Sequence, residues 1–569
     1  MKKLIAAVLF LGAANFGYTQ ILDRGNFTGN METIFQYLNK DSLIGANQPD
    51  SKGLLNAYMN VYYTNGNFRA GMRFESYLPR IQGYPTAFDG TGIGMRYVGW
   101  GNKFIDATVG NFYEQFGNGL SLRAYEDRAL GYDNVLDGIR VKLMPTNGVT
   151  VKAVYGQQRL AFRGGRVDHA EGIVRGVDGD FNFNEIFKKM NDSKVQVTAG
   201  ASFVSKYQKD NLDHLVLPVN VATYGGRFGI SYSGFYLNGE YVEKGQDPST
   251  DNNYIYNKGY AAVANLGYSR KGLGVLLSAK AVDNMSFRSD RSKTMQDVLI
   301  NYLPALTKTH TYNLVSSLYP YATQPTGEIA YQAEVVYTIP KGSKLGGKYG
   351  TTINLNASTA FQPKRNYINY VGVDSTGIPY TTKPFSSSDS LYWLDINASI
   401  SRKFSPRFSA ILSYYHIRLN NDVAAVTKQP GIIRSNTFVL EALYKFKNRS
   451  SLRMEGQVMF VNRIDADNNI VPARTDGAIP TDNGDWATLL IEYTINSNWM
   501  VSVMDQWNFG NPTEYKRAHH PYFTVGYVKG ATRVMASYGR QRAGMFCVGG
   551  VCRVVPASNG LTLSVTHSF

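Results

Sequence analysis

The chain has few of the residues and segments that mark soluble enzymes and helical membrane proteins. It contains 2 cysteines, 7 histidines and 5 tryptophans in 569 residues. No stretch approaches 18 consecutive apolar residues, which excludes a transmembrane helix. A soluble multidomain chain of this length would show helical periodicity and shifts of composition between domains, and neither is obvious. The sequence therefore favours a single repetitive architecture.

The first residues have the pattern of a signal peptide. Met1-Lys2-Lys3 is a basic start, and Leu4 to Ala14 is an apolar run too short to span a bilayer. We expect cleavage near Gln20, with a cut after Ala14 or an uncleaved anchor as the alternatives. No cysteine lies nearby, so a lipoprotein anchor is excluded. The expected organisation is a signal peptide over 1–19 and one domain over 20–569.

Aromatic residues and positive charge are abundant. The chain has 40 tyrosines and 29 phenylalanines, which fits the aromatic girdles of a membrane barrel. The formal charge is +16, or +14 once Lys2 and Lys3 leave with the signal peptide. For an exported membrane protein this charge predicts attraction to anionic lipid headgroups or anionic solutes, and not nucleic-acid binding.

The last nine residues alternate strictly between two faces. Leu561, Leu563, Val565 and Phe569 share one face with His567, and hydroxyl side chains occupy the other. This strand resembles the closing strand of bacterial outer-membrane barrels, in which the terminal Phe is part of the signal read by the barrel-assembly machinery. The resemblance implies export through the inner membrane to the outer membrane of a Gram-negative cell, with outer-membrane lipid and that machinery as partners.

Alternating segments of about ten residues recur along the chain, as in transmembrane barrels. Both termini should be periplasmic, so the strands must alternate in direction. That requirement adds 26–38 and 172–183 and gives about 24 strands, with a range of about 22–26. They lie at 26–38, 53–64, 67–79, 92–100, 103–113, 137–145, 149–160, 172–183, 194–206, 221–232, 235–244, 257–269, 272–282, 328–339, 348–361, 390–402, 406–419, 434–447, 450–463, 486–495, 499–509, 521–529, 531–540 and 560–569.

The connections support an all-β, transmembrane antiparallel β-barrel. Every second connection is tight and carries turn residues, such as Asn65-Gly66 and Ser233-Gly234. The others are mostly long external loops, at 114–136, 207–220, 283–327, 362–389, 464–485 and 541–559. No segment of a hundred residues precedes the first strand, so we expect no separate plug domain. The bore, on the order of 45 Å across, must hold water, inward-folded loops or a partner.

The polar face of each strand should line the lumen. The residues assigned to it are Arg69, Arg73, Glu75, Arg140, Lys142, Lys152, Glu240, Lys244, Glu441, Lys445, Arg453 and Glu455. Similar alternation adds Lys194, Lys206, Lys280, Asp395 and Glu492. Basic residues outnumber acidic ones in this set. Two interpretations remain open: a solvated wall with crossed ion pairs, or a filter that favours anions.

The segment from Gly110 to Asp137 is rich in glycine and then in charge. It resembles alginate-export and related porins, in which such a loop bends into the lumen and forms a charged constriction. The alternative is a salt-bridged loop that stabilises the wall. The candidate constriction residues are Arg123, Glu126, Asp127, Arg128, Asp133 and Asp137.

Loop 283–327 is the longest. It contains apolar residues at helical spacing that end at Pro304, which predicts an amphipathic helix, and then an apolar run from Leu314 to Tyr321. Such a loop should not leave its apolar face in water. We expect it to fold inward as a plug or cap, with docking on an envelope protein as the alternative. The helix is predicted from Met295, Val298, Leu299, Tyr302 and Leu303.

Other segments carry weaker signals. Loop 464–485 is rich in aspartate, which could supply oxygen ligands for Ca²⁺, but its spacing matches no EF-hand, and no metal or cofactor is assigned. Cys547 and Cys552 flank Gly549-Gly550, and in an oxidising compartment a local disulfide is the expected state. His416 lies on a strand without the neighbours of a catalytic triad. We therefore expect no enzymatic activity.

Four segments resemble an uncharacterised family of large outer-membrane barrels from Bacteroidota: 32–39, 71–78, 110–128 and 547–560. The resemblance implies a barrel and its location, and it brings no functional residues. We expect a porin-like channel or export conduit for polar or anionic solutes, gated by loops 114–136 and 283–327. The alternative is an accessory barrel of a multiprotein outer-membrane assembly or secretion machine.

Overall fold

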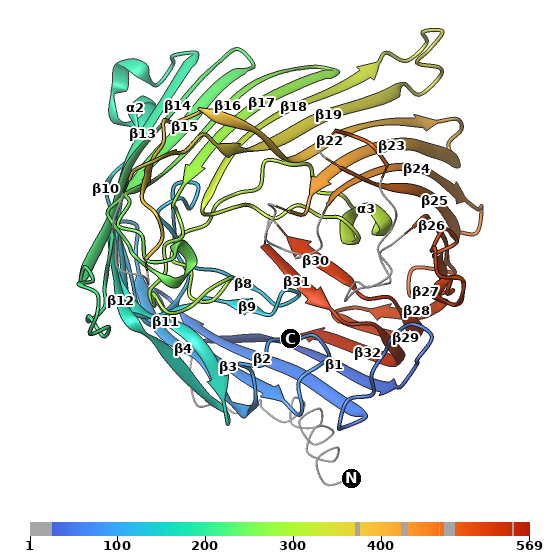
Figure 1. Cartoon of the computed structure of the whole chain (residues 1–569), viewed down its shortest axis with the longest axis horizontal. Coiled ribbons are helices and arrows are strands. Elements are labelled where there is room, and N and C mark those ends of the chain that lie inside the picture. The colour runs from blue at the N-terminus through green and yellow to red at the C-terminus, as the bar shows by residue number, and fades with distance from the viewer. Residues whose placement is uncertain (1–24, 370–375, 423–430, 466, 471–483, 549–550) are drawn as a thin grey trace.

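The wall of the molecule is a closed barrel of 24 antiparallel strands (Figure 1). The computed structural model describes residues 25–569 except 370–375, 423–430, 466, 471–483 and 549–550. The signal-peptide prediction, over 1–19, lies outside the described residues. The predicted strand count, order and direction are confirmed, since each predicted segment overlaps one wall strand.

The wall strands follow one another around the barrel in chain order. They are β1 (Asn26–Asn39), β2 (Gly53–Asn65), β3 (Phe68–Tyr77), β4 (Gly90–Gly101), β5 (Ile105–Phe112), β10 (Leu136–Thr146), β11 (Val149–Arg163), β12 (Arg166–Asn182), β13 (Val195–Tyr207), β14 (Asn220–Tyr232), β15 (Phe235–Lys244), β16 (Gly259–Arg270), β17 (Leu273–Asp283), β18 (Gly327–Ile339), β19 (Thr351–Pro363), β22 (Ser387–Lys403), β23 (Phe408–Asn420), β24 (Ile432–Lys445), β25 (Ser451–Ile464), β26 (Trp486–Thr494), β27 (Trp499–Trp507), β28 (Tyr522–Lys529), β29 (Thr532–Gln541) and β32 (Ser558–Ser568).

The barrel closes where its last strand pairs with its first. β32 pairs with β1 from Asn30–Ser568 to Asn39–Asn559, and on its other side with β29. The backbones of Gly29 and Phe569 exchange two further hydrogen bonds of 2.9 Å. Every wall strand therefore has a neighbour on both sides, and the sheet has no free edge.

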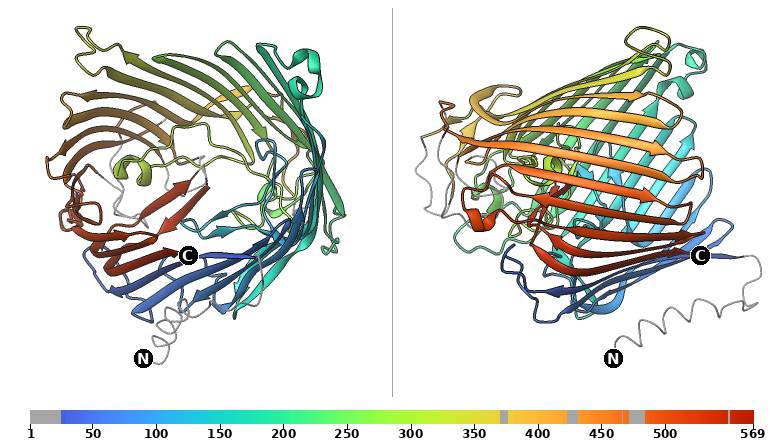
Figure 2. Two further views of the ribbon diagram at one scale, coloured as in Figure 1. Left: turned by 180° about the vertical axis from the view of Figure 1, so that it is seen from behind. Right: turned by 90° about the vertical axis from the view of Figure 1, so that its right-hand side faces the viewer.

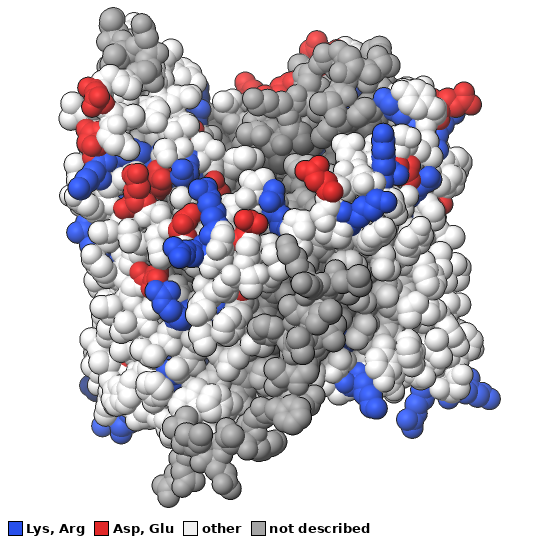
Figure 3. Space-filling view, turned by 90° about the horizontal axis from the view of Figure 1, so that it is seen from below, with Lys and Arg blue, Asp and Glu red and all other residues white. Residues whose placement is uncertain are grey.

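Period-two alternation gives each strand an apolar outer face and a polar inner face. On β3, Phe68 and Met72 are exposed on the outside, at 41% and 38%, whereas Arg73 and Glu75 are 2% and 1% exposed. On β25, Met454 is 42% exposed and Glu455 is 5% exposed. Figure 3 shows a broad white band of uncharged residues across this face.

The two ends of the barrel differ in their connections. At the turn end, where β1 begins and β32 ends, most connections are short; at the loop end most are long (Figure 2). Short connections therefore gather at one end of the barrel and longer ones at the other. The turn-end connections are 66–67, 102–104, 147–148, 183–194, 233–234, 271–272, 340–350, 404–407, 446–450, 495–498 and 530–531.

One loop-end connection is short, contrary to prediction. β11 and β12 run on to Arg163 and Arg166, beyond the predicted 149–160 and 172–183, and join through Gly164-Gly165. This hairpin lies against β4, where a Cβ on Gly92 would be 2.0 Å from the carbonyl oxygen of Gly165. Glycine is required because the two backbones meet directly. The hairpin thus covers the wall above β5 and β10, whose shared ladder is only eight residues long.

Three segments between wall strands lie inside the barrel (Figure 1). The constriction loop, 113–135, contains the two-residue strands β6 (Gln115–Phe116), β7 (Leu122–Arg123), β8 (Glu126–Asp127) and β9 (Tyr132–Asp133). The long inward loop, 284–326, contains α3 (Asn313–Ser317). The inner hairpin consists of β30 (Gly544–Val548) and β31 (Val551–Val555). Among the described residues, no helix is long and apolar enough to cross a membrane.

The helix predicted from Met295, Val298, Leu299, Tyr302 and Leu303 is wrong. Met295 and Val298 have φ values of 58° and 46°, in the left-handed region that a right-handed helix excludes. The backbone there bonds instead to residues far from helical spacing: Ile300 N–H donates to the carbonyl oxygen of Phe287, and the carbonyl oxygen of Ile300 accepts from Arg123 N–H of the constriction loop. Helix forms later, as α3, within the second apolar run.

The register of the inner hairpin yields a prediction about the two cysteines, whose side chains lie outside the described ones. Cys547 and Cys552 are direct partners, one step from the Val548–Val551 pair that closes the hairpin. The cysteine pair, one step from the closing pair, is one whose residues do not hydrogen-bond to each other through the backbone. In pairs of this kind the Cα atoms are about 4.5 Å apart, within the range of a disulfide. In protein purified without reductant, mass spectrometry of the tryptic peptide 543–553 should show a mass two hydrogens below the dithiol form. Complete alkylation of both cysteines before reduction would contradict this.

Candidate functional site

The constriction loop is held to the wall by a buried network of ion pairs. Arg73 on β3 contacts Glu75 at 2.8 Å, Glu126 at 2.8 Å and Asp133 at 2.9 Å. Arg159 on β11 contacts Glu75 at 2.7 Å and Asp133 at 3.0 Å. Two wall arginines therefore share one wall carboxylate and two loop carboxylates. The side chains of Arg73, Arg159, Glu75 and Asp133 are at most 5% exposed.

Burial makes this network sensitive to the loss of any one member. A charge removed from water is tolerated only when it is paired and its hydrogen-bonding groups are satisfied. Removing one partner leaves the other charge uncompensated, which costs about 3–5 kcal/mol in a buried pair. The network therefore fixes where the constriction loop lies.

Further contacts tie the constriction loop to the wall around it. Arg128 bonds Glu32 on β1 at 2.9 Å and Glu126 at 3.0 Å. Glu114 accepts a bond from Arg140 on β10 at 2.7 Å. On the far side, the backbone N–H of Asn118 donates to Glu240 on β15 at 2.7 Å. Contacts to β1, β10 and β15 thus hold the loop across a wide arc of the barrel.

The structure brings together three of the six predicted constriction residues, Glu126, Arg128 and Asp133. Arg123 instead stacks on the rings of Tyr125 and Tyr302, at 4.3 and 4.0 Å. Asp127 accepts a bond from the backbone N–H of Leu130, which closes a turn.

Asp137 lies apart from the other constriction candidates. It is on the same face of β10 as the exposed Ile139, and it pairs with Arg96 at 3.6 Å and His169 at 3.2 Å. The side chain of Arg96 is 62% exposed. Asp137 and its partners therefore lie on the outer face of the wall. β10 begins at Leu136, so the strand alternation already applies to Asp137 and turns its side chain outward.

The long inward loop packs on an apolar patch of the inner wall. Leu314 and Val315 of α3 are 0% and 1% exposed and belong to one cluster with Trp393, Ile417 and Met459 of the wall. Full burial of a leucine or valine contributes about 1.5–3 kcal/mol. The prediction that this loop folds inward agrees with these contacts.

Polar contacts fix the remainder of the long inward loop. Lys280, which is 0% exposed, bonds Glu328 at 2.6 Å and the carbonyl oxygen of Pro304 at 2.6 Å. Lys244 donates to the carbonyl oxygen of Ser286 at 2.7 Å. His310 lies 2.9 Å from Asp395 on β22. Lys244, Lys280 and Asp395, expected to line the lumen, are thus covered by this loop.

The inward segments also bond to one another. The backbone N–H of Arg123 donates to the carbonyl oxygen of Ile300, and that of Tyr302 to Gly119, at 2.8 and 2.9 Å. At the other end of the loop, Arg542 beside the inner hairpin donates to Ser317 of α3 at 2.5 Å. The three segments therefore form one connected assembly inside the barrel.

The other residues assigned to the lumen mostly have acidic or basic partners. Arg69 and Arg140 both contact Asp106, at 2.6 and 3.1 Å. Arg453 contacts Glu441 at 2.9 Å, Glu492 at 2.5 Å, and Glu455. Lys152 lies 3.4 Å from Glu114. These crossed pairs agree with the interpretation of the inner wall as a paired, polar surface.

Of the remaining assigned lysines, Lys206 is buried near the loop end of β13 and pairs with Asp247 at 2.7 Å, and the other three lie towards the turn end. Lys142 stands opposite Lys152 on one side and Asp106 on the other. Lys445 is the exposed last residue of β24. Lys194 precedes β13 in a turn-end connection, where it is exposed, so its placement on the inner face of a strand is corrected.

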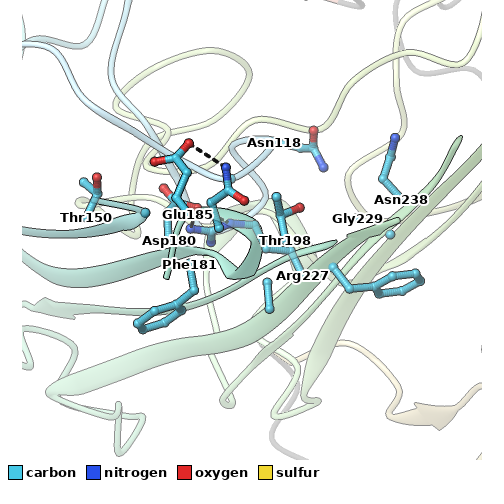
Figure 4. Close-up of a pocket in the computed structure, with 15 residues that line it drawn as sticks. Asn118, Thr150, Asp180, Phe181, Glu185, Thr198, Arg227, Gly229 and Asn238 are labelled. Carbon is cyan, nitrogen blue, oxygen red and sulfur yellow. Dashed lines mark hydrogen bonds and ion pairs between the residues drawn. The ribbon is translucent and has the colours of Figure 1, made fainter. Parts of the chain in front are cut away.

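A polar hollow of about 560 Å³ lies on the wall between β11 and β15 (Figure 4). Asn118 of the constriction loop borders it, and Asp180, Thr198 and Asn238 point into it from the strands, while the ring of Phe181 points to the other side of the sheet. Arg227 is held there by Asp178 at 2.8 Å and Asp180 at 2.5 Å. The hollow offers hydrogen-bonding groups with its main charges already paired.

Burial shifts the titration of groups in the inward and loop-end segments. It raises the pKa of Glu126, and the neighbouring Asp133 raises it further. Burial and Asp133 also raise the pKa of Tyr113 well above its usual value. In the connection between β27 and β28, burial lowers the pKa of His520 to about 4, so this imidazole is neutral at physiological pH.

The described residues include no group of three or more His, Cys, Asp or Glu side chains arranged to hold a metal. Most of the aspartate-rich loop 464–485 lies outside the described residues, so its Ca²⁺ alternative stays untested. His416 bonds Asn436 at 2.9 Å, which is a wall contact.

Sequence reasoning missed Arg159, Asp106, Glu114 and Glu328 as partners of the assigned charges. These four residues could have been predicted in principle, because each falls on the inner face of a strand or at the start of an inward segment. It also missed the apolar inner patch. Its signal was the loss of alternation at Leu391-Tyr392-Trp393-Leu394 and Ile432-Ile433, near the loop end of two strands.

Comparison with solved structures finds matches of low similarity. The copper transporter OprC is 11% identical with a TM-score of 0.41, covering 97% of this chain and 84% of that one. The siderophore receptor PirA from Pseudomonas aeruginosa is 10% identical with a TM-score of 0.41, covering 97% and 81%. The P pilus usher PapC translocation pore is 8% identical with a TM-score of 0.41, covering 95% and 99%.

Sequence comparison gives a family assignment without an activity. No curated protein matches the chain. One family model, described as a family of unknown function (DUF6029), matches residues 1–569. The match extends over the wall and all of the inward segments together. The chain therefore belongs to the DUF6029 family.

Proposed function

We propose that the protein spans the outer membrane of a Gram-negative bacterium as a gated conduit for polar solutes or an export substrate. The gate consists of the constriction loop and the long inward loop. In the closed sheet every wall strand has a neighbour on both sides, as a membrane favours, and its outer face carries exposed apolar side chains within an uncharged band (Figure 3).

One observation carries the proposal. The constriction loop is joined to the wall by a compact set of buried charges, Arg73, Arg159, Glu75, Glu126 and Asp133. The ion pairs of such a set form or break together, because leaving one buried charge without its partner is costly in free energy. That property supports two discrete loop positions, which a gate needs.

The inner charges support a polar pathway with a modest preference for anions. Most inward carboxylates and guanidinium groups are paired with each other, so little unbalanced charge faces the bore. Lys142 and Lys445 lie towards the turn end and favour anions there. We expect a small positive excess to act as a weak filter.

An accessory barrel of an envelope machine is the second candidate. The apolar residues of 284–326 that suggested a partner are mostly buried in the barrel, which weakens that argument. Exposed apolar side chains in loop-end connections still favour it, namely Val216 at 87% and Tyr515 at 72%. A pull-down in mild detergent that recovers no stoichiometric partner would contradict this second candidate function.

The gate is tested by weakening one anchor without changing its shape. Asp133→Asn keeps the volume of the side chain but removes a charge that bonds both Arg73 and Arg159. Leaving buried donors poorly satisfied costs about 1–3 kcal/mol, so openings in planar bilayers should become roughly ten- to hundredfold more frequent.

Asp178→Asn is the matched control. Asp178 is also buried and bonded to an arginine, Arg227, but both residues belong to the wall. This variant should open no more often than the unaltered protein. Equal opening frequencies of the Asp133 and Asp178 variants would refute the assignment of the gate.

Deletion of 285–325 tests the conduit itself. Removing the long inward loop should raise single-channel conductance in planar bilayers, and a salt gradient should give a reversal potential on the anion side. Folding is checked by the heat-dependent migration typical of assembled barrels. A folded barrel that stays silent after this deletion counts against the conduit.

A further inference from the structure

The turn end of the barrel carries most of the net charge of the chain. Besides Lys445 on the inner face of β24, fourteen exposed lysine and arginine residues lie in its connections or at the strand ends that lead directly into them, against two exposed acidic residues, Glu185 and Asp192. We call the fourteen the basic ring. They are Lys103, Lys188, Lys189, Lys194, Arg270, Lys271, Lys341, Lys344, Lys348, Lys403, Arg407, Lys447, Arg449 and Lys529. The whole sequence has a formal charge of +16.

The basic ring has no internal partner that would explain it. None of its members forms an ion pair within the described part of the chain, although 43 acidic residues are present in the sequence. At the loop end, by contrast, basic and acidic side chains are interspersed. Figure 3 shows this difference, with mixed red and blue above the white band and only blue at the lower edge.

The ring follows the circumference of the barrel. Its members occupy seven of the eleven turn-end connections, from the β4–β5 turn to the β28–β29 turn. A docking site for one protein would gather charge on one arc. A distribution over most of the rim fits a partner that surrounds the barrel, which is a lipid leaflet.

Aromatic side chains lie next to the ring on the outer face. Phe104, Phe187 and Phe404 are 52%, 53% and 54% exposed. Lys103 lies over the ring of Phe104 at 4.7 Å, and Lys403 over Tyr349 at 5.2 Å. Aromatic rings at headgroup depth, with lysine and arginine reaching past them, are the pattern of a membrane interface.

We propose that the basic ring binds the phosphate headgroups of anionic phospholipids in the periplasmic leaflet. The proposal rests on the membrane location proposed above but not on conduction or gating. Each lysine or arginine near an anionic surface strengthens binding by about fivefold, and the effect is screened by salt. The ring thereby anchors the turn end at a fixed depth and enriches anionic lipid around the barrel.

The test compares lipid retention by two charge-neutralised variants. The ring variant changes Lys341, Lys344, Lys348, Arg407, Lys447 and Arg449 to Gln. The control changes six exposed loop-end residues, Lys40, Lys52, Arg166, Lys209, Lys364 and Lys383, to Gln. Native mass spectrometry then counts phosphatidylglycerol and phosphatidylcholine retained from equimolar mixed micelles.

The unaltered protein and the control should retain phosphatidylglycerol over phosphatidylcholine by roughly tenfold or more, and high salt should reduce this ratio. The ring variant should lose most of the preference while assembling normally, as judged by heat-dependent migration on gels. Equal retention of both lipids by the unaltered protein, or equal loss in both variants, overturns the proposal. Ring-dependent cross-linking to a periplasmic protein without lipid preference also overturns it. A barrel that shows no conductance in planar bilayers but still prefers phosphatidylglycerol would refute the conduit and support the proposal for the basic ring.

Discussion

Closure of the wall is the constraint on which the rest of the structure depends. β32 pairs with β1 over ten residues, so each strand has two neighbours and the number of strands sets the bore. Side chains alone cannot fill a barrel of 24 strands. The interior must hold water or chain, and here three loop-end segments enter it. Their backbone and charged groups then need partners, which the inner faces of the strands supply.

The pairing of buried charge follows from that entry. Glu126 and Asp133 enter a region where Arg73 and Arg159 are at most 3% exposed, and unpaired ions there would be costly. Buried pairs add little net stability, but they penalise every position of the loop that leaves a charge alone. An apolar contact such as Leu314 against the wall tolerates small shifts more readily. The position of the constriction loop is therefore more narrowly defined than that of the long inward loop. It is also the position that a single change of charge can disturb.

Period two and strand direction were enough to predict the wall from the sequence. The direction rule placed strands at 26–38 and 172–183, and β1 and β12 occupy those positions. The interior was less predictable, because its partners come from distant parts of the chain. Glu126, Arg128 and Asp133 could be named from charge density, but Arg159 could not be matched to them without the register of β11. The spacing from Met295 to Leu303 suggested a helix, yet apolar spacing cannot distinguish a helix from a coil whose side chains and backbone are buried by surrounding strands.

The positive charge of the chain has a different meaning once its positions are known. Counted along the sequence, it predicted attraction to anionic lipid headgroups or anionic solutes, and an anion filter was one of two interpretations of the lumen-facing charges. In the structure most interior charge is neutralised by pairing, because a narrow, partly buried space makes unpaired ions costly. Excess charge is tolerated where water or headgroups solvate it, and the turn end is such a place. The net charge therefore describes the rim of the barrel more than its interior. In the conduit proposed above, the anion preference would come from the few lysines, such as Lys142, that lie inside the wall near that rim.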